Sequence, residues 1–431
     1  MRLDMGTFQV QAAEFGKKTQ LANGTLVINQ EELRSLIRED DSFLDVGIDI
    51  ARHGESVRII HVTDVVEPRY KVEGPGCTFP GFLGLPVTVG EGRTHRLAGV
   101  GVVTTSEPVP GERLHAREAI IEMSGPASQY TPFGNLINVT LALKPNLELF
   151  PKEEAQPDAL GVNAPRAQEY AYASTKAGFK AASYLAQATR DLRPQGVETL
   201  ELAPCSPSLL KVALLYQASR PFYYGALVSF VAGTLMHPNE SFDGALAKAF
   251  SGISASYRHA TYLEQNNQIA LDFCRRHGKD VNFVGIILYG GATPSVAEKE
   301  RVSSSASKLA RVMGVQAAIL NEHSASNGSQ DAMLTLQKCE QAGIKTVLIH
   351  FDVGSGLDDP GMVFFVPEAD AIALSGSRDR PVTLPPVEKV IGGTHLIEEG
   401  WNASGELQTT VKHLYSATNS LGMTRAMTYM R

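Results

Sequence analysis

The sequence contains little cysteine, and the positions of its cysteines argue against two kinds of structure. Its 431 residues include 4 cysteines and 1 tryptophan. The four cysteines lie far apart and form no CxxC pair: Cys77, Cys205, Cys274 and Cys339. This spacing argues against a disulfide framework and against a thiolate zinc site. We therefore expect a reduced, cytoplasmic protein.

Long apolar runs and basic runs are also missing. The most apolar stretch, YYGALVSFVAGTLM at residues 223–236, is broken by glycine and is too short to span a bilayer. The first residues contain no apolar segment typical of a signal peptide. The net charge is −7 without a basic run, which argues against nucleic acid as a partner. We expect binding neither to a membrane nor to nucleic acid.

The second half of the chain alternates strand and helix patterns. Strand-like runs at 211–217 (KVALLYQ), 282–291, 315–322 and 345–352 are separated by segments of helical length. Such crossovers predict a doubly wound, mostly parallel sheet. The glycine turn YGGATP that follows residue 288 lacks both the GxGxxG pattern and the Walker lysine, so no nucleotide cofactor is expected.

The first half of the chain has a different pattern, which is mostly typical of strands. It predicts a hairpin at Asn23-Gly24, a short helix over residues 31–40 and a strand that starts at residue 57 and stops before Pro68. We predict an α/β protein in three parts. Residues 1–150 form a β-rich α+β domain, residues 151–204 a proline-bearing linker with one long helix, and residues 205–431 the doubly wound domain.

Polar side chains follow two consecutive strands of the predicted sheet. Glu322 and His323 follow one strand, while His350 and Asp352 follow the next. Because ligands bind at the carboxyl ends of such strands, we predict a site there. Glu322, His323 and Asp352 are candidate catalytic acid–base groups, and His323, His350 and Asp352 are candidate ligands of a divalent metal. The alternative is that exposed loops at strand ends are polar without any such role.

Several dispersed stretches carry a family resemblance, among them MRLDMGTFQV, VGEGRTH, MSGPASQYTPF, HPNESFDGA, TYLEQNN, EKERVSSSASKLA and LPPVEKVIGG. Over nearly its whole length the chain resembles the component B proproteins of the glycine, sarcosine and betaine reductases. The resemblance implies a hetero-oligomer with a gamma-like subunit that carries cysteine or selenocysteine. It also implies a small-molecule amine substrate, whose amine is displaced from the α-carbon by that thiol or selenol.

In the family, the proprotein cleaves at a cysteine between the DGA and TY motifs and leaves a pyruvoyl group on the downstream fragment. This chain has no cysteine between Asp243 and Tyr262. Counted forward from DGA the cysteine position falls on Ser251, and counted back from TY it falls on Gly252. Serine can support the same acyl shift, so Ser251 is a further candidate catalytic residue and the candidate pyruvoyl precursor, with Asn239 and Asp243 as candidate neighbours of the cofactor.

The other outcome, which we expect, is a chain that remains intact. Two classes of function therefore follow. The first is a reductase-like subunit that cleaves a C–N or similar bond together with its thiol or selenol partner. The second is an uncleaved relative that uses the strand-end His, Asp and Glu residues as a metal-assisted hydrolase or lyase. A non-catalytic partner subunit is a third alternative.

Overall fold

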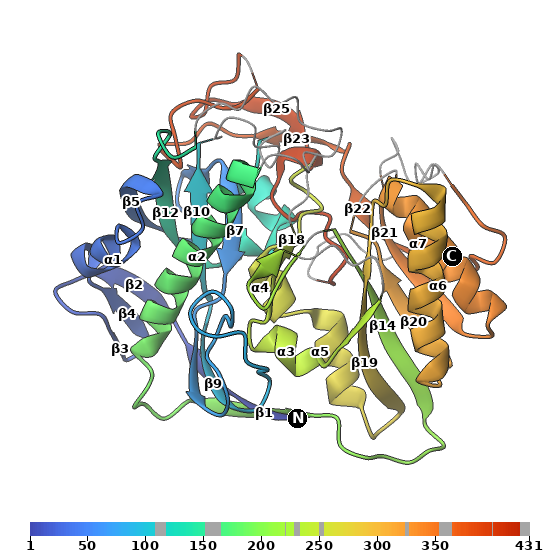
Figure 1. Cartoon of the computed structure of the whole chain (residues 1–431). Coiled ribbons are helices and arrows are strands. Elements are labelled where there is room, and N and C mark those ends of the chain that lie inside the picture. The colour runs from blue at the N-terminus through green and yellow to red at the C-terminus, as the bar shows by residue number, and fades with distance from the viewer. Residues whose placement is uncertain are drawn as a thin grey trace.

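The computed structural model describes residues 1–107, 118–150, 165–219, 221–227, 233–249, 254–323, 327–352, 364–398 and 400–422. Its N-terminal part is built mainly from strands, with a long helix across them (Figure 1). The elements are β1 (Arg2–Gln9), β2 (Ala12–Phe15), β3 (Gln20–Ala22), β4 (Thr25–Ile28), α1 (Gln30–Ile37), β5 (Phe43–Ala51), β6 (Val57–Ile59), β7 (Val62–Val66), β8 (Arg69–Glu73), β9 (Gly92–Ala98), β10 (Val100–Ser106), β11 (Ile121–Glu122), β12 (Ile137–Pro145), α2 (Pro165–Gln187) and β13 (Gly196–Glu201).

These strands pair in small sheets, two of which have the orders β13–β1–β9–β8 and β5–β12–β10–β7. Helix α2 packs against β7, β8 and β10. The predicted hairpin is confirmed, because β3 and β4 are antiparallel and Asn23 and Gly24 have φ of 50° and 77°. The strand predicted to start at residue 57 is instead two strands, β6 and β7. His61 adopts a φ of 54° between them, and this left-handed conformation sends the two strands into different sheets.

The second half contains the doubly wound sheet, in the order β17–β19–β14–β20–β21–β22. All neighbours in it are parallel except β17 and β19. The elements are β14 (Leu210–Ala218), β15 (Pro221–Tyr223), β16 (Ala226–Leu227), β17 (Thr234–Met236), α3 (Pro238–Phe242), β18 (Leu246–Ala249), α4 (Thr261–Gln265), α5 (Gln268–Arg276), β19 (Val281–Gly290), α6 (Val296–Val312), β20 (Ala317–Asn321), α7 (Asn327–Gln341), β21 (Lys345–Asp352), β22 (Ile372–Ser377), β23 (Pro381–Leu384), β24 (Lys389–Ile391) and β25 (Leu407–Thr410).

The central strand β14 is covered on both faces. Ala213 and Leu215 belong to the core under α6 and α7, whereas Leu214 and Tyr216 belong to the core that includes Phe273 of α5. This alternation follows from the two-residue period of a strand. Figure 1 shows α6 and α7 on one side of the sheet and α3 to α5 on the other. Tyr216 therefore points toward the helices that connect β14 to β19.

The α/β fold class is confirmed, whereas the division into three parts remains a prediction. Strand pairing also joins the three predicted parts, because β1 pairs with β13 and β6 pairs with β24.

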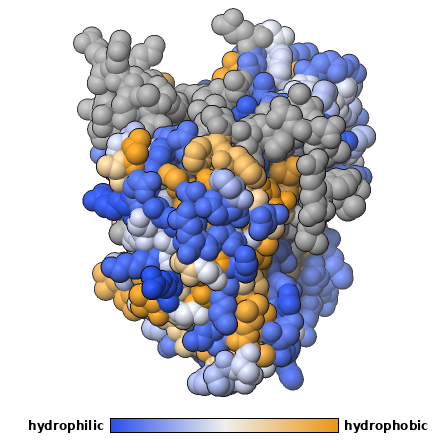
Figure 2. All heavy atoms as spheres, turned by 90° about the vertical axis from the view of Figure 1, so that its right-hand side faces the viewer, coloured by the Kyte–Doolittle hydropathy of each residue, from blue (hydrophilic) through white to orange (hydrophobic). Residues whose placement is uncertain are grey.

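Figure 2 shows the face that carries α6, where hydrophobic side chains lie in separate patches among hydrophilic ones. Val296 and Val312 of α6 are among the large hydrophobic side chains exposed to solvent. Among the described residues, no helix combines the length and the apolarity needed to cross a membrane.

Candidate functional site

The carboxyl ends of β14 and β20 lie side by side in the middle of the doubly wound sheet. The two strands pair in parallel up to Tyr216 and Asn321. Ligands of doubly wound proteins bind beyond this edge of the sheet. Polar side chains that other segments bring to this edge are therefore candidates for function.

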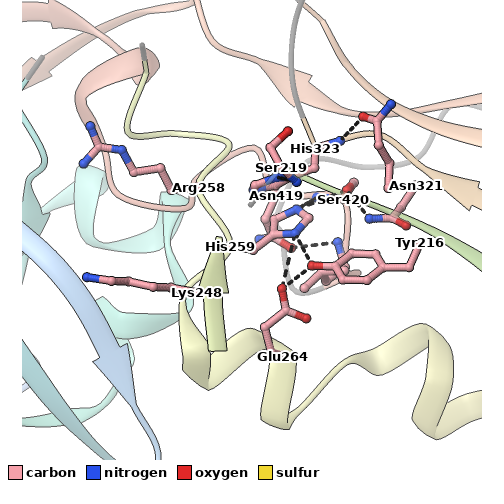
Figure 3. Close-up of polar contacts among 12 residues, drawn as sticks. Tyr216, Ser219, Lys248, Arg258, His259, Glu264, Asn321, His323, Asn419 and Ser420 are labelled. Atoms are coloured by element: carbon pink, nitrogen blue, oxygen red, sulfur yellow. Dashed lines mark hydrogen bonds and ion pairs between the residues drawn. The ribbon is translucent and has the colours of Figure 1, made fainter. Parts of the chain in front are cut away.

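His259 and Glu264 meet Tyr216 at this edge (Figure 3). His259 precedes α4, and Glu264 lies within α4. The Tyr216 hydroxyl lies 2.8 Å from Nδ1 of His259 and donates a hydrogen bond to Oε1 of Glu264. The same carboxylate oxygen is 3.6 Å from Nδ1 of His259. Each of the three residues is 1 % exposed, so the network is closed to bulk water.

Burial changes the charge of these groups. Desolvation raises the pKa of Glu264 to about 8 and lowers the pKa of His259 to about 3. The pKa of Tyr216 is raised well above its ordinary value by burial and by the neighbouring Glu264. At neutral pH the three side chains are therefore predominantly uncharged, and they form a hydrogen-bonded network rather than an ion pair.

His323 continues the network from the end of β20. Its ring centroid lies 4.2 Å from that of His259. Its Nδ1 accepts a hydrogen bond of 3.2 Å from the backbone N–H of Ser219, and its own backbone N–H donates to Oε1 of Gln217 at 3.0 Å. Burial, with a smaller contribution from His259, lowers the pKa of His323 well below its ordinary value. His323 is thus a second neutral imidazole.

Ser420, far along the chain, joins these residues together. Its hydroxyl donates to the backbone oxygen of Glu322 at 2.7 Å and accepts from Nδ2 of Asn321 at 3.3 Å. Its backbone N–H donates to Nε2 of His259 at 3.4 Å. We call the whole group the strand-end cluster: Tyr216, Ser219, His259, Glu264, Asn321, His323 and Ser420.

The strand-end cluster contains several unsatisfied polar atoms. Four buried side-chain atoms of this cluster have no hydrogen-bond partner among the described residues: Oγ of Ser219, Oε2 of Glu264, Oδ1 of Asn321 and Nε2 of His323. Buried polar atoms in folded proteins are nearly always paired, so a concentration of unpaired ones requires a cause. A bound small molecule with complementary polar atoms is such a cause.

The segment that carries His259 is fixed by pairing with residues near the C-terminus. The backbone N–H groups of Ala255 and Ser256 both donate to the oxygen of Lys412, at 3.1 and 3.3 Å. The N–H of Thr418 donates to the oxygen of Ser256 at 2.7 Å. These bonds hold His259 at the edge of the sheet.

The predicted strand-end residues are only partly brought together. His350 Nδ1 forms a contact with Oε2 of Glu322, whose other oxygen accepts from the Ser329 hydroxyl. Glu322 and His350 are fully buried, so a carboxylate and an imidazole do meet as expected. His323 instead faces His259. The side chain of Asp352 lies outside the described residues.

The metal site remains a prediction, and the tautomer of His323 bears on it. A neutral histidine that binds a metal through Nε2 must carry its proton on Nδ1. In this structure an N–H donor from Ser219 faces Nδ1, which opposes that tautomer. Among the described residues, no group of three or more His, Cys, Asp or Glu side chains gathers as a metal site would require.

Asn239 and Asp243, the predicted neighbours of the cofactor, make structural contacts. Asp243 accepts hydrogen bonds from the N–H of Gly90 at 2.9 Å and the hydroxyl of Thr94 at 2.5 Å, and it pairs with Lys71. Nδ2 of Asn239 donates to the backbone oxygens of Gly90 and of a residue in β13. Both residues therefore tie α3 to the N-terminal strands, and a role beside a cofactor remains a prediction.

Ser251, the predicted cleavage residue, lies outside the described residues. The described residues on either side are buried and anchored. The N–H of Lys248 donates to the hydroxyl of Thr261 at 3.0 Å, and the hydroxyl of Ser254 donates to the oxygen of Lys412 at 2.9 Å. In Figure 3 the side chain of Lys248 extends away from the strand-end cluster, and its Nζ donates to the oxygen of Thr63 at 3.2 Å.

Sequence reasoning did not find Tyr216, His259 or Glu264. One signal was available. The predicted strand KVALLYQ ends in Tyr216 and Gln217, so these two polar side chains also lie at the carboxyl end of a strand. The other signal was the motif RHATYLE, which holds both His259 and Glu264. What the sequence does not reveal is that β14 lies between β19 and β20, which brings its carboxyl end to the middle of the sheet.

Comparison with known proteins gives a match over almost the whole chain. Residues 1–428 match the family model described as glycine/sarcosine/betaine reductase component B subunits. The chain is 33 % identical, over 100 % of both chains, to glycine reductase complex component B subunits alpha and beta of Acetoanaerobium sticklandii. It is 34 % identical to the sarcosine reductase complex component B subunit alpha of Peptoclostridium acidaminophilum, over 92 % of this chain and 91 % of the relative. It is 31 % identical to the betaine reductase complex component B subunit alpha of the same organism, over 96 % of this chain and 93 % of the relative. No solved structure matches the chain.

Proposed function

Because the chain belongs to the family of glycine, sarcosine and betaine reductase component B subunits, we propose that it binds the substrate of a reductase complex at the strand-end cluster. There it takes part in the reductive cleavage of a C–N or similar bond of a small amino-acid-like substrate. The observation that carries the proposal is the match over residues 1–428, together with a buried polar cluster at the ligand-binding edge of the sheet.

The substrate class follows from the names of the relatives. Glycine, sarcosine and betaine all have a carboxylate one carbon away from nitrogen, and they differ only in the methylation of that nitrogen. We infer that this chain takes a small molecule with the same carboxylate.

The reaction needs a nucleophile from a partner subunit. A thiolate or selenolate of a gamma-like partner attacks the α-carbon, the C–N bond breaks, and its electron pair leaves with the amine. The α-carbon is then attached to sulfur or selenium. A dithiol reductant supplies two electrons to break this bond, so that the carbon takes up a proton, the partner's thiol or selenol is regenerated and the dithiol becomes a disulfide. Glu264 supports this chemistry, because a carboxyl group with a pKa of about 8 can take up or release a proton near neutral pH.

A pyruvoyl group at Ser251 would supply a ketone that activates an amine as an electron sink. The absence of cysteine between Asp243 and Tyr262 favours an intact chain. Without that group the nitrogen must already be a good leaving group. A quaternary ammonium keeps its positive charge in any site, while a primary ammonium can lose a proton and become a poor leaving group. An intact chain is therefore expected to favour a betaine-like substrate over glycine.

The direct test measures amine release from glycine, sarcosine and betaine by the full chain with its co-purified partner and a dithiol reductant. Glu264→Ala should lower the rate by roughly 10²- to 10⁴-fold if Glu264 transfers a proton. The matched control is Glu198→Ala, which removes a half-exposed carboxylate bound to Arg275 on the surface. Failure to release amine from all three substrates would overturn the proposed function.

A reducing compartment fits this chemistry. All four cysteines are free thiols in the structure. We therefore propose a cytoplasmic location for the complex.

A metal-assisted hydrolase or lyase is the second candidate, and the contact between Glu322 and His350 favours it. It predicts a stoichiometric metal in the purified chain and activity that a chelator removes in the absence of any partner. Asp352→Ala should then cost roughly 10²- to 10⁴-fold in rate without loss of folding. A non-catalytic partner subunit would show neither this activity nor any effect of Glu264→Ala on the complex.

A further inference from the structure

The tautomer of His323 is determined by its surroundings. The backbone N–H of Ser219 donates to Nδ1, so this nitrogen acts as the acceptor and carries no proton. Burial keeps the ring neutral, since its pKa lies well below the ordinary value. The single ring proton is therefore on Nε2, which presents an N–H donor.

This donor has no acceptor within the described part of the chain, and neither has the hydroxyl of Ser219. His323 is 0 % and Ser219 is 6 % exposed, so bulk water does not satisfy either atom. The two residues are neighbours, joined by the hydrogen bond from the Ser219 N–H to the His323 ring. They follow β14 and β20, the two adjacent strands at the centre of the sheet (Figure 3).

A pair of unpaired donors selects an acceptor ligand. The Ser219 hydroxyl can accept as well as donate, but the Nε2–H of His323 can only donate. An ammonium group has only N–H donors or methyl groups and therefore offers the His323 N–H nothing to bind. A carboxylate can accept hydrogen bonds from both groups, and bonds to an ionised acceptor are the stronger kind. The nearby ring of His259 is neutral, and Glu264 lies beyond it, bound to Tyr216.

We propose that Nε2–H of His323 and the hydroxyl of Ser219 bind the carboxylate of the substrate. The inference rests on the proposed function, which supplies a substrate with a carboxylate, and it adds the residues that recognise that group. The cationic nitrogen of the substrate then lies away from this donor pair.

The experiment measures equilibrium binding to the full chain, with its partner subunit present and reductant absent so that no turnover occurs. Calorimetric titrations use three probes: betaine, acetate as a carboxylate without an amine, and choline as a trimethylammonium without a carboxylate. The variants are Ser219→Ala, which removes one donor, and His323→Phe, which keeps a ring but removes the other. His323→Gln restores an N–H donor near the position of Nε2.

Ser219→Ala and His323→Phe should each weaken the binding of betaine and acetate by roughly 10- to 100-fold and leave choline unaffected. His323→Gln should recover part of the affinity for acetate. The matched control is Ser303→Ala, a buried serine of α6 whose hydroxyl bonds the oxygen of Asp331 at 3.5 Å, and its affinities should equal those of the wild type. Unchanged melting temperatures show that the variants are folded.

The inference is overturned if folded Ser219→Ala and His323→Phe bind acetate as tightly as the wild type does. It is also overturned if these variants lose as much affinity for choline as for betaine and acetate. A wild-type complex that binds neither betaine nor acetate also overturns it. If the complex still releases amine in these cases, the proposed function stands and only the assignment of the carboxylate site fails. If no amine is released from any of the three substrates, the proposed function itself fails.

Discussion

Replacing Glu264 by glutamine should change how stability depends on pH. Glutamine has the shape of the protonated carboxyl group, and its oxygen can still accept from Tyr216. The pKa of Glu264 rises from its ordinary value of 4.5 to about 8 on folding, because the side chain is buried and its neighbours Tyr216 and His259 supply no positive charge at neutral pH. Between these values the folded state holds a proton that the unfolded state has lost, so the stabilisation present below pH 4.5 is lost as the pH rises through 8.

The size of the effect follows from the same interval. A tenfold change in proton affinity corresponds to about 1.4 kcal/mol, so the free energy of unfolding of the wild type should fall by roughly 5 kcal/mol relative to Glu264→Gln between pH 4.5 and 8. His259 and His323 are present in both proteins, and their contributions cancel in the difference. Urea unfolding of both proteins at intervals from pH 4 to 9 gives this difference directly. Two stability curves that stay parallel over that range would refute the assigned protonation of Glu264.

Three further outcomes are expected. Denaturing mass spectrometry should show one uncut chain for the wild type and for Ser251→Ala, and the two proteins should be equally active. Cleavage at this serine would instead be established by two fragments in the wild type and in Ser251→Cys, and by a single chain in Ser251→Ala. Affinity purification from the native host should recover a second subunit with a reactive thiol or selenol, and a fully active single species would contradict this. Asp243→Ala should destabilise the fold by roughly 3–5 kcal/mol, because it leaves the buried ammonium of Lys71 without its ion-pair partner. Removal of the half-exposed Asp49, which pairs with Lys389, should cost about 1 kcal/mol or less in the same urea assay.

The parts of the fold that depend on local pattern were predictable from the sequence. The alternation of apolar strands and helical segments after residue 205 predicts the parallel sheet, and Asn23-Gly24 predicts the hairpin that β3 and β4 form. The interruption at His61 was not predictable, because the left-handed φ of this residue is stabilised by contacts with distant segments, including the backbone oxygen of His395 and the carboxylate of Glu118.

The candidate site was predictable only in part, for a topological reason. The meeting of Glu322 and His350 follows from the pairing of consecutive strands, β20 with β21. The meeting of Tyr216 with His259 and Glu264 requires that the chain insert β14 between two later strands and return with α4 over its face. Ser420 joins the same cluster from near the C-terminus. Such contacts between distant residues leave no periodic signal in the sequence.

The position of β14 also has a consequence for biogenesis. This strand leaves the ribosome before either of its neighbours, since β19 begins at Val281 and β20 at Ala317. Its apolar side chains and both of its backbone edges remain without partners until those residues have been synthesised, and translation proceeds at roughly 5–20 residues per second. An unpaired apolar strand is a template for association with other chains. A truncated chain that ends before Val281 is therefore expected to aggregate, and recombinant production should improve when translation is slowed by low temperature or when chaperones are supplied.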